Sequence, residues 1–370
     1  MTPTPSGKML EGMAYKTSDS TMKSETDLEK PKNETKEYKM QVVWNRIAIL
    51  IYLHLAGFYG MYLMCTKSHI LSPFLMYGFV ILTGLGTGAG CHRLWSHRAY
   101  KAKLPMRIIM MCLQTIGYQG HIYGWVRDHR VHHKFVDTDA DPHNSKRGFF
   151  FSHMGWLMVK KHPEVRRKGA TVDLSDLKKD PVVMFQKKYY APMVALFCFG
   201  IPAATVHYLF GEPWFDAYHL ACAKFLWSTH LTWLINSGAH MWGARPYDKT
   251  MTARNNLALA VAVVGEGWHN YHHVFPWDYK SSELGNYKTN TPTAFIDFFA
   301  WLGLAYDLKT VPTAMINKRA ARTGDGTRVS AFFDNDHQRK EHEADNVWGW
   351  DDKDMAEEDK KEALILNKEH

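Results

Sequence analysis

Nine histidines and one asparagine fall in groups whose spacing suits metal binding. The groups are an HxxxxH, two HxxHH motifs and an Asn-x-x-x-His, formed by His92 and His97, by His129, His132 and His133, by His269, His272 and His273, and by Asn236 and His240. On an α-helix, residues i, i+3 and i+4 lie on one face. Each HxxHH therefore predicts three imidazoles that point at one place. The wider spacing of His92 and His97 predicts a pair that straddles a metal or lies where a helix ends.

The number of imidazoles indicates two metal ions, because one octahedral ion takes at most six ligands. No carboxylate lies inside the four groups, and imidazole suits iron, copper, zinc and nickel alike, so spacing alone does not select the metal. A single HxxHH can arise by chance in a chain with 21 histidines, whereas three such motifs together favour a metal site. Isolated histidines are not expected to be ligands, namely His54, His69, His207 and His219. Structural or supporting roles are expected for His121, His143, His153 and His162.

Four stretches contain no Asp, Glu, Lys or Arg over the roughly 20 residues that a helix needs to cross a bilayer. They run from Ile47 to Thr66, Ser68 to His92, Tyr189 to Gly211 and Phe225 to Ala244. Lys67 alone divides the first pair, and a few charged residues divide the second. We therefore predict an all-α membrane protein whose four transmembrane helices form two hairpins. A buried helix of a soluble core is the alternative for each run, but four runs in close pairs favour the membrane.

The charges between the runs predict an orientation. Residues 93–188 hold 19 Lys and Arg against 8 Asp and Glu, and basic residues favour the cytosolic side. We expect this segment and both termini to be cytosolic. Residues 1–40 lack the apolar core of a secretory signal and predict a disordered tail. Residues 331–370 carry 13 acidic and 6 basic side chains, which predicts a second, solvated tail with a possible helix near Met355–Leu366.

Composition excludes several classes of protein. The net charge is +8 with 46% apolar residues, which does not fit a wholly disordered chain, a collagen or a disulfide scaffold. The five cysteines form no CxxC and are interpreted as packing residues. The glycine-rich stretch Gly84–Gly90 lacks the full GxGxxG spacing and predicts close helix packing or a ligand channel rather than a nucleotide loop. No basic patch has the aromatic pattern of a nucleic-acid module, so no nucleic-acid partner is expected.

Longer strings around the motifs resemble the acyl-CoA desaturases. They are His92-Arg-Leu-Trp-Ser-His97, Trp125-Val-Arg-Asp-His129-Arg-Val-His132-His133-Lys134, Asp139-Ala-Asp141-Pro-His143-Asn144 and Gly265-Glu-Gly-Trp-His269-Asn-Tyr-His272-His273-Val-Phe-Pro276. The chain looks like an invertebrate member of the stearoyl-CoA, or Δ9, desaturase family. The similarity spans about residues 41–328 and includes Arg322-Thr-Gly-Asp-Gly-Thr327. The expected domains are thus a tail (1–40), a membrane-embedded catalytic domain (41–328) and a charged C-terminal tail (329–370).

The resemblance implies the fold and the chemistry. It implies four transmembrane helices capped by a cytosolic helical domain in the endoplasmic reticulum membrane. It implies two irons, O₂ as oxidant, and electrons from cytochrome b5 and NADH-cytochrome b5 reductase. The implied reaction puts a cis double bond, Δ9 by default, into a saturated long-chain acyl-CoA during unsaturated fatty acid biosynthesis. The nine histidines match the family's iron ligands, and Asn236 matches an amide that reaches the metal through water.

Further residues should surround the irons and the substrate. Metal-bound imidazoles are held through their second nitrogen, so supporting carboxylates are expected among Asp137, Asp139, Asp141, Glu164 and Glu266. The family's CoA-contacting residues match Arg127, Asp128, Lys160, Lys161 and Trp233, and cations suit the phosphates of CoA. Without the resemblance, Lys160 and Lys161 would be interpreted as part of a basic membrane-surface patch.

Two positions that differ from the family, and the expected end of the acyl tunnel, concern the substrate. Arg46 and Gly120 stand where the family has asparagines, which leaves the detailed CoA contacts open. The resemblance places the end of the acyl tunnel near Val80 and Gly84. Both residues are small, so we expect acyl chains as long as stearoyl or longer to be accepted.

Two other classes of protein share parts of the pattern, namely other enzymes with histidine motifs and membrane transporters or haem proteins. A lipid hydroxylase begins with the same hydrogen abstraction, and only loss of two hydrogens versus gain of one oxygen in the product separates the two activities. A front-end desaturase is disfavoured because the haem-binding HPGG is absent and the third motif begins with His269 rather than Gln. A transporter or haem protein would place ligands or acids within the apolar runs, which lack acids. The double-bond position, chain-length preference, oligomeric state and distribution of ligands between the irons stay open.

Overall fold

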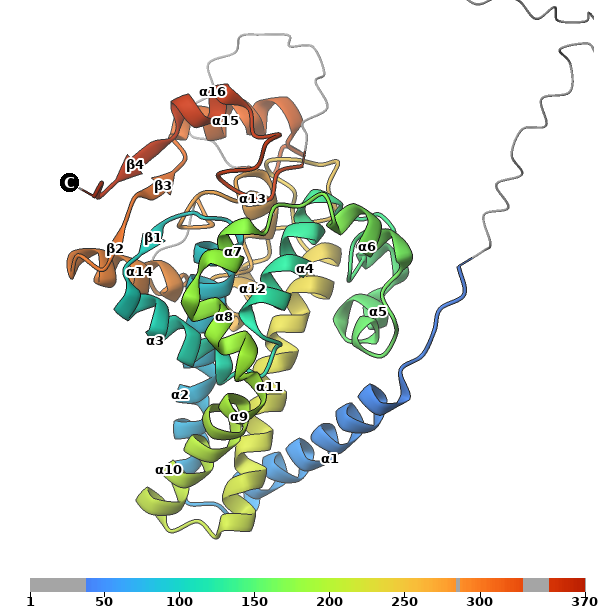
Figure 1. Ribbon diagram of the computed structural model, residues 1–370, viewed down its shortest axis with the longest axis vertical. Helices are drawn as coiled ribbons and strands as arrows, with labels where there is room; N and C mark the ends of the chain where they lie inside the picture. The colour runs from blue at the N-terminus through green and yellow to red at the C-terminus, as the bar shows by residue number, and fades with distance from the viewer. Residues whose placement is uncertain (1–37, 284–286, 329–345, 370) are drawn as a thin grey trace, which may run out of the picture. The chain divides into compact units, whose positions relative to one another are not determined.

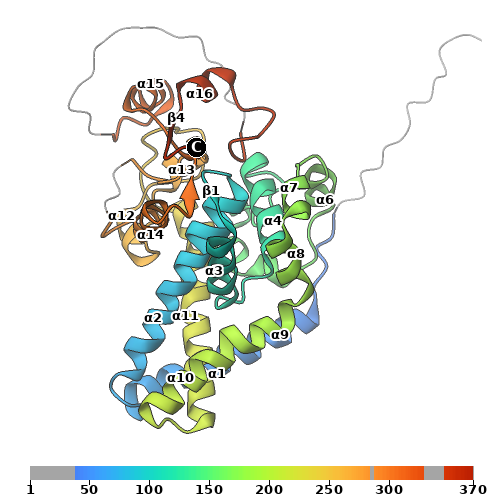
Figure 2. The ribbon, with the colours of Figure 1, turned by 60° about the vertical axis from the view of Figure 1, so that its left-hand side comes forward.

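The computed structural model describes residues 38–283, 287–328 and 346–369. The predicted N-terminal tail therefore lies outside the described residues, apart from its last three. The described part is mostly helical, as predicted, with two short two-stranded sheets. Figures 1 and 2 show α1, α2, α9, α10 and α11 extending to one side of the remaining helices.

The first two apolar runs form a helical hairpin. The first run is α1 (Trp44–Thr66), and the second is α2 (Ser72–Leu85), which continues without interruption into the π-helix η1 (Gly86–Ser96). Two glycines of α1 allow a very close approach to α11. A Cβ added to Gly60 would lie 1.9 Å from the backbone oxygen of His219, and one added to Gly57 would lie 2.8 Å from Leu226. Small residues at such contacts let apolar helices pack through their backbones.

The other two runs form a second hairpin. The third run is α9 (Tyr190–Val194), the π-helix η4 (Ala195–Gly200) and α10 (Ile201–Phe210), followed by α11 (Trp214–Met241). Among the described residues, three helical stretches are long and apolar enough to cross a bilayer, namely Trp44–Thr66, Ser72–Ser96 and Tyr190–Phe210. α11 has 28 residues but carries Asp216 and Lys224 in its first half. Three of the four expected spans are thus long apolar helices that could cross a membrane, and the fourth stays a prediction.

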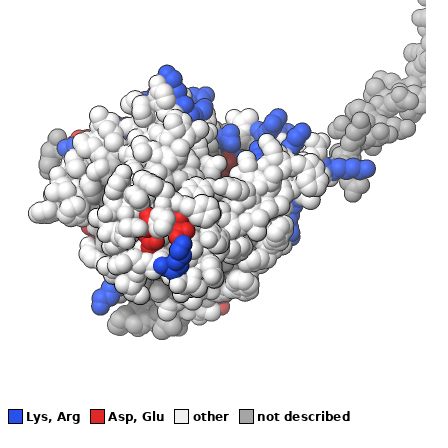
Figure 3. All heavy atoms as spheres, turned by 90° about the horizontal axis from the view of Figure 1, so that it is seen from below, with Lys and Arg blue, Asp and Glu red and all other residues white. Residues whose placement is uncertain are grey.

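The turns of the two hairpins are tied together. The carboxylate of Glu212 accepts hydrogen bonds from the backbone of His69 at 2.7 Å and from the hydroxyl of Ser72 at 2.6 Å. Lys67 pairs with Asp216 at 2.7 Å. Seen from this end, the surface is largely uncharged around one small group of acidic and basic side chains (Figure 3). The turns that we expect on the far side of the membrane therefore hold each other in place.

The remaining elements surround the ends of α2 and α11. Between the hairpins lie β1 (Lys101–Ala102), α3 (Leu104–Thr115), α4 (Ile122–Lys134), α5 (Phe149–His153), α6 (Pro163–Gly169), α7 (Ser175–Lys179) and α8 (Pro181–Lys188), with 3-10 turns at Ser145–Arg147 and Gly155–Leu157. After α11 follow α12 (Leu257–Ala262), α13 (His269–Val274), α14 (Thr291–Trp301), β2 (Ala305–Tyr306), β3 (Leu308–Thr310), α15 (Thr313–Thr323), α16 (Glu357–Glu362) and β4 (Leu364–Leu366). β1 pairs antiparallel with β2, and β3 pairs antiparallel with β4.

The glycine-rich stretch packs closely, as predicted. It lies at the junction of α2 and η1, and a Cβ on Gly86 would lie 2.3 Å from the backbone nitrogen of Gln114 at the end of α3. A Cβ on Gly90 would lie 3.2 Å from Met110. Because these positions hold no side chain, α3 lies directly against η1. The five cysteines are free, and three of them are buried, which agrees with a packing role.

The end of the chain corrects the expectation of a solvated tail. Residues 346–369 pack against the preceding helices and strands: Trp348 and Met355 are buried, and β4 pairs with β3. The possible helix near Met355–Leu366 is limited to α16, because the chain leaves the helix for β4 at Leu364. The expectation was wrong because it rested on the many charged residues of this segment, whereas a few apolar residues anchor it. Residues 329–345 of the predicted tail lie outside the described residues.

Candidate metal centre

All nine predicted histidines come together in two adjoining groups. Group one consists of His92, His97, His129, His133 and His272, and group two consists of His132, His240, His269 and His273. Within each group the nearest ring nitrogens all lie within 4.8 Å of one another. The rings of His133 and His273 stack at 4.2 Å between the groups, so the two sites are immediate neighbours.

The Nε2 atoms point inward in both groups. In group one, the Nε2 of His272 lies 2.8 Å from that of His92 and 3.0 Å from that of His133. In group two, the Nε2 of His269 lies 2.9 Å from that of His240 and 3.1 Å from that of His273. Lone pairs converging in this way would repel one another, so the geometry is that of ligands arranged around cations.

Each HxxHH motif divides its histidines between the groups, which corrects the expectation that all three point at one place. From α4, His129 and His133 join group one, while His132 joins group two. From α13 the division is reversed, because His269 and His273 join group two and His272 joins group one. Residues i and i+4 stay together, whereas i+3 lies far enough round the helix to face the neighbouring site.

The π-helix explains the pairing of His92 and His97. The backbone nitrogen of His97 donates to the oxygen of His92 at 3.2 Å, which is the i to i+5 bond of a π-helix. This wider turn brings the two rings to 4.9 Å, both in group one. The sequence left open whether the pair straddles a metal or ends a helix, and the structure shows both rings in one group where η1 ends.

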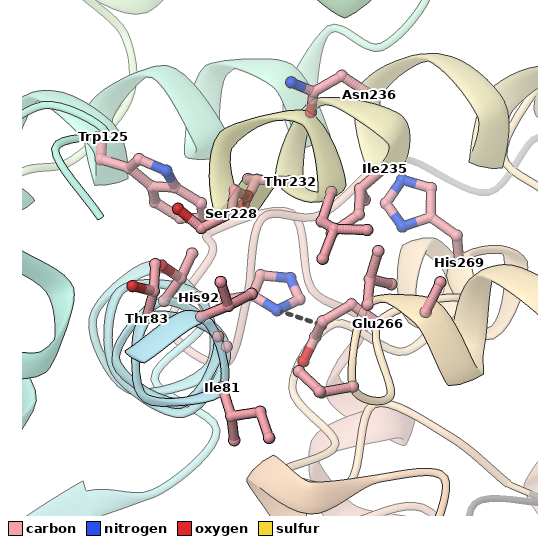
Figure 4. Close-up of a pocket in the computed structure, with 18 of the residues that line it drawn as sticks. Ile81, Thr83, His92, Trp125, Ser228, Thr232, Ile235, Asn236, Glu266 and His269 are labelled. Carbon is pink, nitrogen blue, oxygen red and sulfur yellow. Dashed lines mark hydrogen bonds and ion pairs between the residues drawn. The ribbon is translucent and has the colours of Figure 1, made fainter. Parts of the chain in front are cut away.

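Carboxylates hold several rings through Nδ1. Glu266 accepts from His92 at 2.8 Å and pairs with Arg93 at 2.7 Å, and Figure 4 shows the carboxylate beside the His92 ring. Asp141 accepts from His132 at 2.9 Å and lies 3.5 Å from His143. Glu266 and Asp141 therefore take the supporting positions predicted for them.

The other three candidate carboxylates take different positions from Glu266 and Asp141. Asp137 acts indirectly, because its Oδ1 accepts from the hydroxyl of Thr252 at 2.8 Å, and that hydroxyl lies 2.8 Å from the Nδ1 of His240. Asp139 is exposed, and Glu164 pairs with Arg167 at the surface. No sequence pattern marked Thr252 or the backbone oxygen of Trp348, which accepts from the Nδ1 of His97 at 2.5 Å.

Burial favours the neutral form of most of these rings. It lowers the pKa of six of them well below the ordinary value, namely His97, His129, His133, His269, His272 and His273. Burial likewise lowers the pKa of His132 to about 4. Glu266 is also buried, but Arg93 and His92 outweigh the cost of burial and hold the pKa of its carboxyl well below its usual range. Neutral rings offer lone pairs, so the all-nitrogen donor set fits two iron ions.

An apolar cavity opens onto both groups. It holds about 830 Å³ of free space, its open mouth included. His92 and His129 of group one and His132 and His269 of group two line it, and Figure 4 shows part of this wall. Val80 and Gly84, which the resemblance places at the end of the acyl tunnel, line the same cavity. Its remaining lining comes mostly from α2, η1 and α11, where apolar residues such as Ile81, Leu231 and Ile235 alternate with hydroxyl-bearing ones.

A second, more polar cavity adjoins the first. The two share Trp125, His129, Thr232 and Asn236 in their walls, so they meet beside the histidines. The second cavity is lined by four of the five residues matched to the family's CoA contacts, and also by Arg46, which we expected on the same substrate-binding side; the four are Arg127, Asp128, Lys161 and Trp233. Lys160 is exposed and is not part of this wall.

The charged residues of the second cavity are organised by Asp128. Its carboxylate pairs with Arg127 at 2.9 Å and with Lys161. Arg46 donates to the backbone oxygen of Val159 at 3.4 Å. Gly120 also lines the cavity, and its φ of 92° favours glycine, which gives a conformational reason for the departure at that position.

Three further histidines surround Trp233. His54, His153 and His230 lie with ring centroids 6.4, 5.7 and 5.1 Å from its indole. They are linked in a chain, with 3.2 Å between the Nε2 atoms of His54 and His230, and 2.9 Å from His230 Nδ1 to His153 Nε2. None belongs to either metal group, in agreement with the roles predicted for His54 and His153.

Comparisons with known proteins agree with this geometry. The family model "Fatty acid desaturase" matches residues 68–286. An acyl-CoA Delta-9 desaturase of Acheta domesticus is 49% identical over 366 residues, 99% of this chain and 97% of the relative. An acyl-CoA Delta12-desaturase of the same species is 49% identical over 342 residues, 92% of this chain and 90% of the relative. An acyl-CoA Delta(11) desaturase of Spodoptera littoralis is 47% identical over 320 residues, 86% and 89% of the two chains.

These similarities are equally high for relatives named after three different double-bond positions, so they do not select one. The family model covers more than half of the chain, and the relatives match nearly all of it. The resemblance carried by the histidine strings is therefore confirmed, and this chain belongs to the fatty acid desaturase family.

Proposed function

We propose that this protein is a membrane-bound acyl-CoA desaturase that introduces a cis double bond, Δ9 by default, into saturated long-chain acyl-CoA. One observation carries the proposal. Nine imidazoles form two adjoining groups beside an apolar cavity, and that cavity meets a charged one. Such a site combines a place for two metal ions, a place for an acyl chain and a place for a phosphorylated headgroup.

The charged cavity would hold the CoA portion. Arg46, Arg127 and Lys161 offer cations for its phosphates, and Asp128 holds two of these side chains in place. The acyl chain would then pass Trp125 and Thr232 into the apolar cavity. Apolar walls exclude water and hold one pair of methylenes beside the histidines.

The nine histidines would hold two irons, and Asn236, which lines both cavities beside them, would contribute through water. Bound iron would supply the oxidation chemistry with O₂ that unactivated methylenes require. The reaction removes two hydrogens from the chain, and with two electrons and two protons it converts O₂ to two waters. We propose cytochrome b5 and its NADH-dependent reductase as the electron source.

The proposed setting is the endoplasmic reticulum membrane, with both termini and the histidines on the cytosolic side. Four spans would fix this topology, with α11 as the fourth. Support comes from three confirmed apolar helices and from the excess of basic residues between the hairpins. This topology gives the histidine groups access to a cytosolic reductant and the acyl cavity access to the bilayer.

Expression in a desaturase-deficient yeast tests the proposed activity. We expect growth without added unsaturated fatty acids and new lipids lighter by two hydrogens. Mapping of the double bonds identifies their position, and Δ9 is the expected result. Products heavier by one oxygen would show hydroxylation instead. A Δ11 or Δ12 product would overturn only the proposed Δ9 position and not the proposed desaturation.

A further inference from the structure

The C-terminal strap, defined as residues 346–354, lies directly on the iron site. Trp348 is only 3% exposed and packs in an apolar cluster with Val131 of α4. A Cβ added to Gly349 would lie 2.5 Å from the backbone oxygen of His97. That same oxygen accepts a hydrogen bond from the backbone of Trp350 at 3.0 Å. The strap therefore runs against the residue that ends η1.

One hydrogen bond connects the strap to a ring of group one. The Nδ1 of His97 lies 2.5 Å from the backbone oxygen of Trp348. A carbonyl oxygen only accepts, so Nδ1 must carry the proton and Nε2 must carry the lone pair. The Nε2 of His97 lies 2.9 Å from that of His129, inside the group. The strap thus selects the tautomer and the ring orientation that bind a metal.

Side chains of the strap fix the position of that carbonyl. The guanidinium groups of Arg130 and Arg98 lie 4.2 and 5.1 Å from the centroid of the Trp348 ring. The carboxylate of Asp352 accepts from the backbone nitrogen of Trp348 at 2.8 Å. Lys134 donates to Asp352 at 3.2 Å and directly follows His133 on α4. The strap is thereby tied to the two elements that supply four of the five rings of group one.

We propose that the C-terminal strap is a positioning element of the iron site, which secures iron in group one by holding His97. The proposal rests on the proposed function, since it requires that group one binds iron. Outer hydrogen bonds to metal-bound histidines typically change metal affinity roughly 10- to 100-fold. Loss of the hydrogen bond from the strap to His97 should weaken the binding of iron in group one and leave the binding of iron in group two unchanged.

The test compares iron retention in full-length purified variants under a chelator. Trp348→Ala removes the ring that Arg130 covers, and Asp352→Asn weakens the tie to Lys134 with less risk to folding. Both should release one of two irons roughly 10-fold faster or more than the unchanged protein. Trp348→Phe keeps an aromatic ring and should restore retention, and Lys353→Ala, an exposed neighbour, is the matched control.

A double variant separates positioning from general loss of structure. If the strap acts through His97, adding Trp348→Ala to His97→Ala should cause no further loss of iron. Additive losses, or retention unchanged in both Trp348→Ala and Asp352→Asn, would overturn the strap proposal. Absence of iron and of desaturation in the unchanged protein would instead overturn the proposed function.

Discussion

At the scale of single residues, the site is determined by which nitrogen of each imidazole faces inward. Glu266, Asp141 and Thr252 hold Nδ1 of His92, His132 and His240, so that Nε2 is free for a metal. The sequence predicted the nine histidines and both of these carboxylates. It could not predict the hydroxyl of Thr252 or a backbone oxygen, because neither residue type marks a ligand partner.

Replacement of a ligand histidine should abolish turnover without affecting membrane insertion. His133→Ala removes a ring of group one that also stacks on His273 of group two. The apolar helices alone drive insertion, so the variant should appear in the membrane fraction at the usual level while its product falls below detection. His219→Ala, at the far end of α11, is the control that keeps activity. If His133→Ala, His273→Ala and His97→Ala all stay active, the site assignment is wrong.

The metal-free protein should lose stability as the pH falls below 6.5. Burial lowers the pKa of His132 to about 4 and that of His143 to about 3, whereas unfolded histidines titrate near 6.5. Between these values the unfolded chain binds more protons, so the free energy of unfolding falls by about 1.4 kcal/mol per group and pH unit. Melting temperatures of the metal-free protein at pH 7 and pH 5 measure this effect. A higher melting temperature at pH 5 would contradict it.

At the scale of elements, helix geometry decides where each ring points. Helical periodicity predicted that the HxxHH motifs form compact ligand sets, but the i+3 ring of each helix faces the other group. The π-turn that joins His92 and His97 could not be predicted, since its i to i+5 bonds depend on packing between η1 and its neighbours. The apolar runs, by contrast, predicted α1, α2 and the α9–α10 helix directly, because length and composition alone define a membrane span.

The walls supplied by α2 should set the acyl chain length. Val80 and Gly84 are small, and a Cβ on Gly84 would lie only 2.8 Å from Val264, so free space here depends on the missing side chain. We expect the unchanged enzyme to accept stearoyl and longer chains, and Val80→Phe to shift the preference to shorter ones. Product profiles across acyl lengths measure both effects.

Phe74→Leu is a suitable control for that experiment, because Phe74 lies on α2 but is 70% exposed on its outer face. Its profile should match that of the unchanged enzyme. Activity that peaks at 14 carbons and vanishes at 18 in the unchanged enzyme would refute the open tunnel end.

At the scale of the whole molecule, segments far apart in the chain meet at one place. η1, α4, α11 and α13 each contribute rings, and two cavities join beside them. The sequence indicated this convergence, because its histidine motifs were all expected on the same side of the membrane. It did not indicate that residues 346–369 pack back against the rest of the molecule, since the few buried aromatic and apolar residues there stand among many charges.

These imidazoles should hold two irons next to the acyl cavity. Anomalous diffraction at the iron absorption edge, from crystals of the purified full-length enzyme, locates bound iron. We expect two iron peaks per chain, one among His92, His97, His129, His133 and His272 and one among His132, His240, His269 and His273. A single peak, a peak outside these rings or no iron in the active enzyme would contradict it.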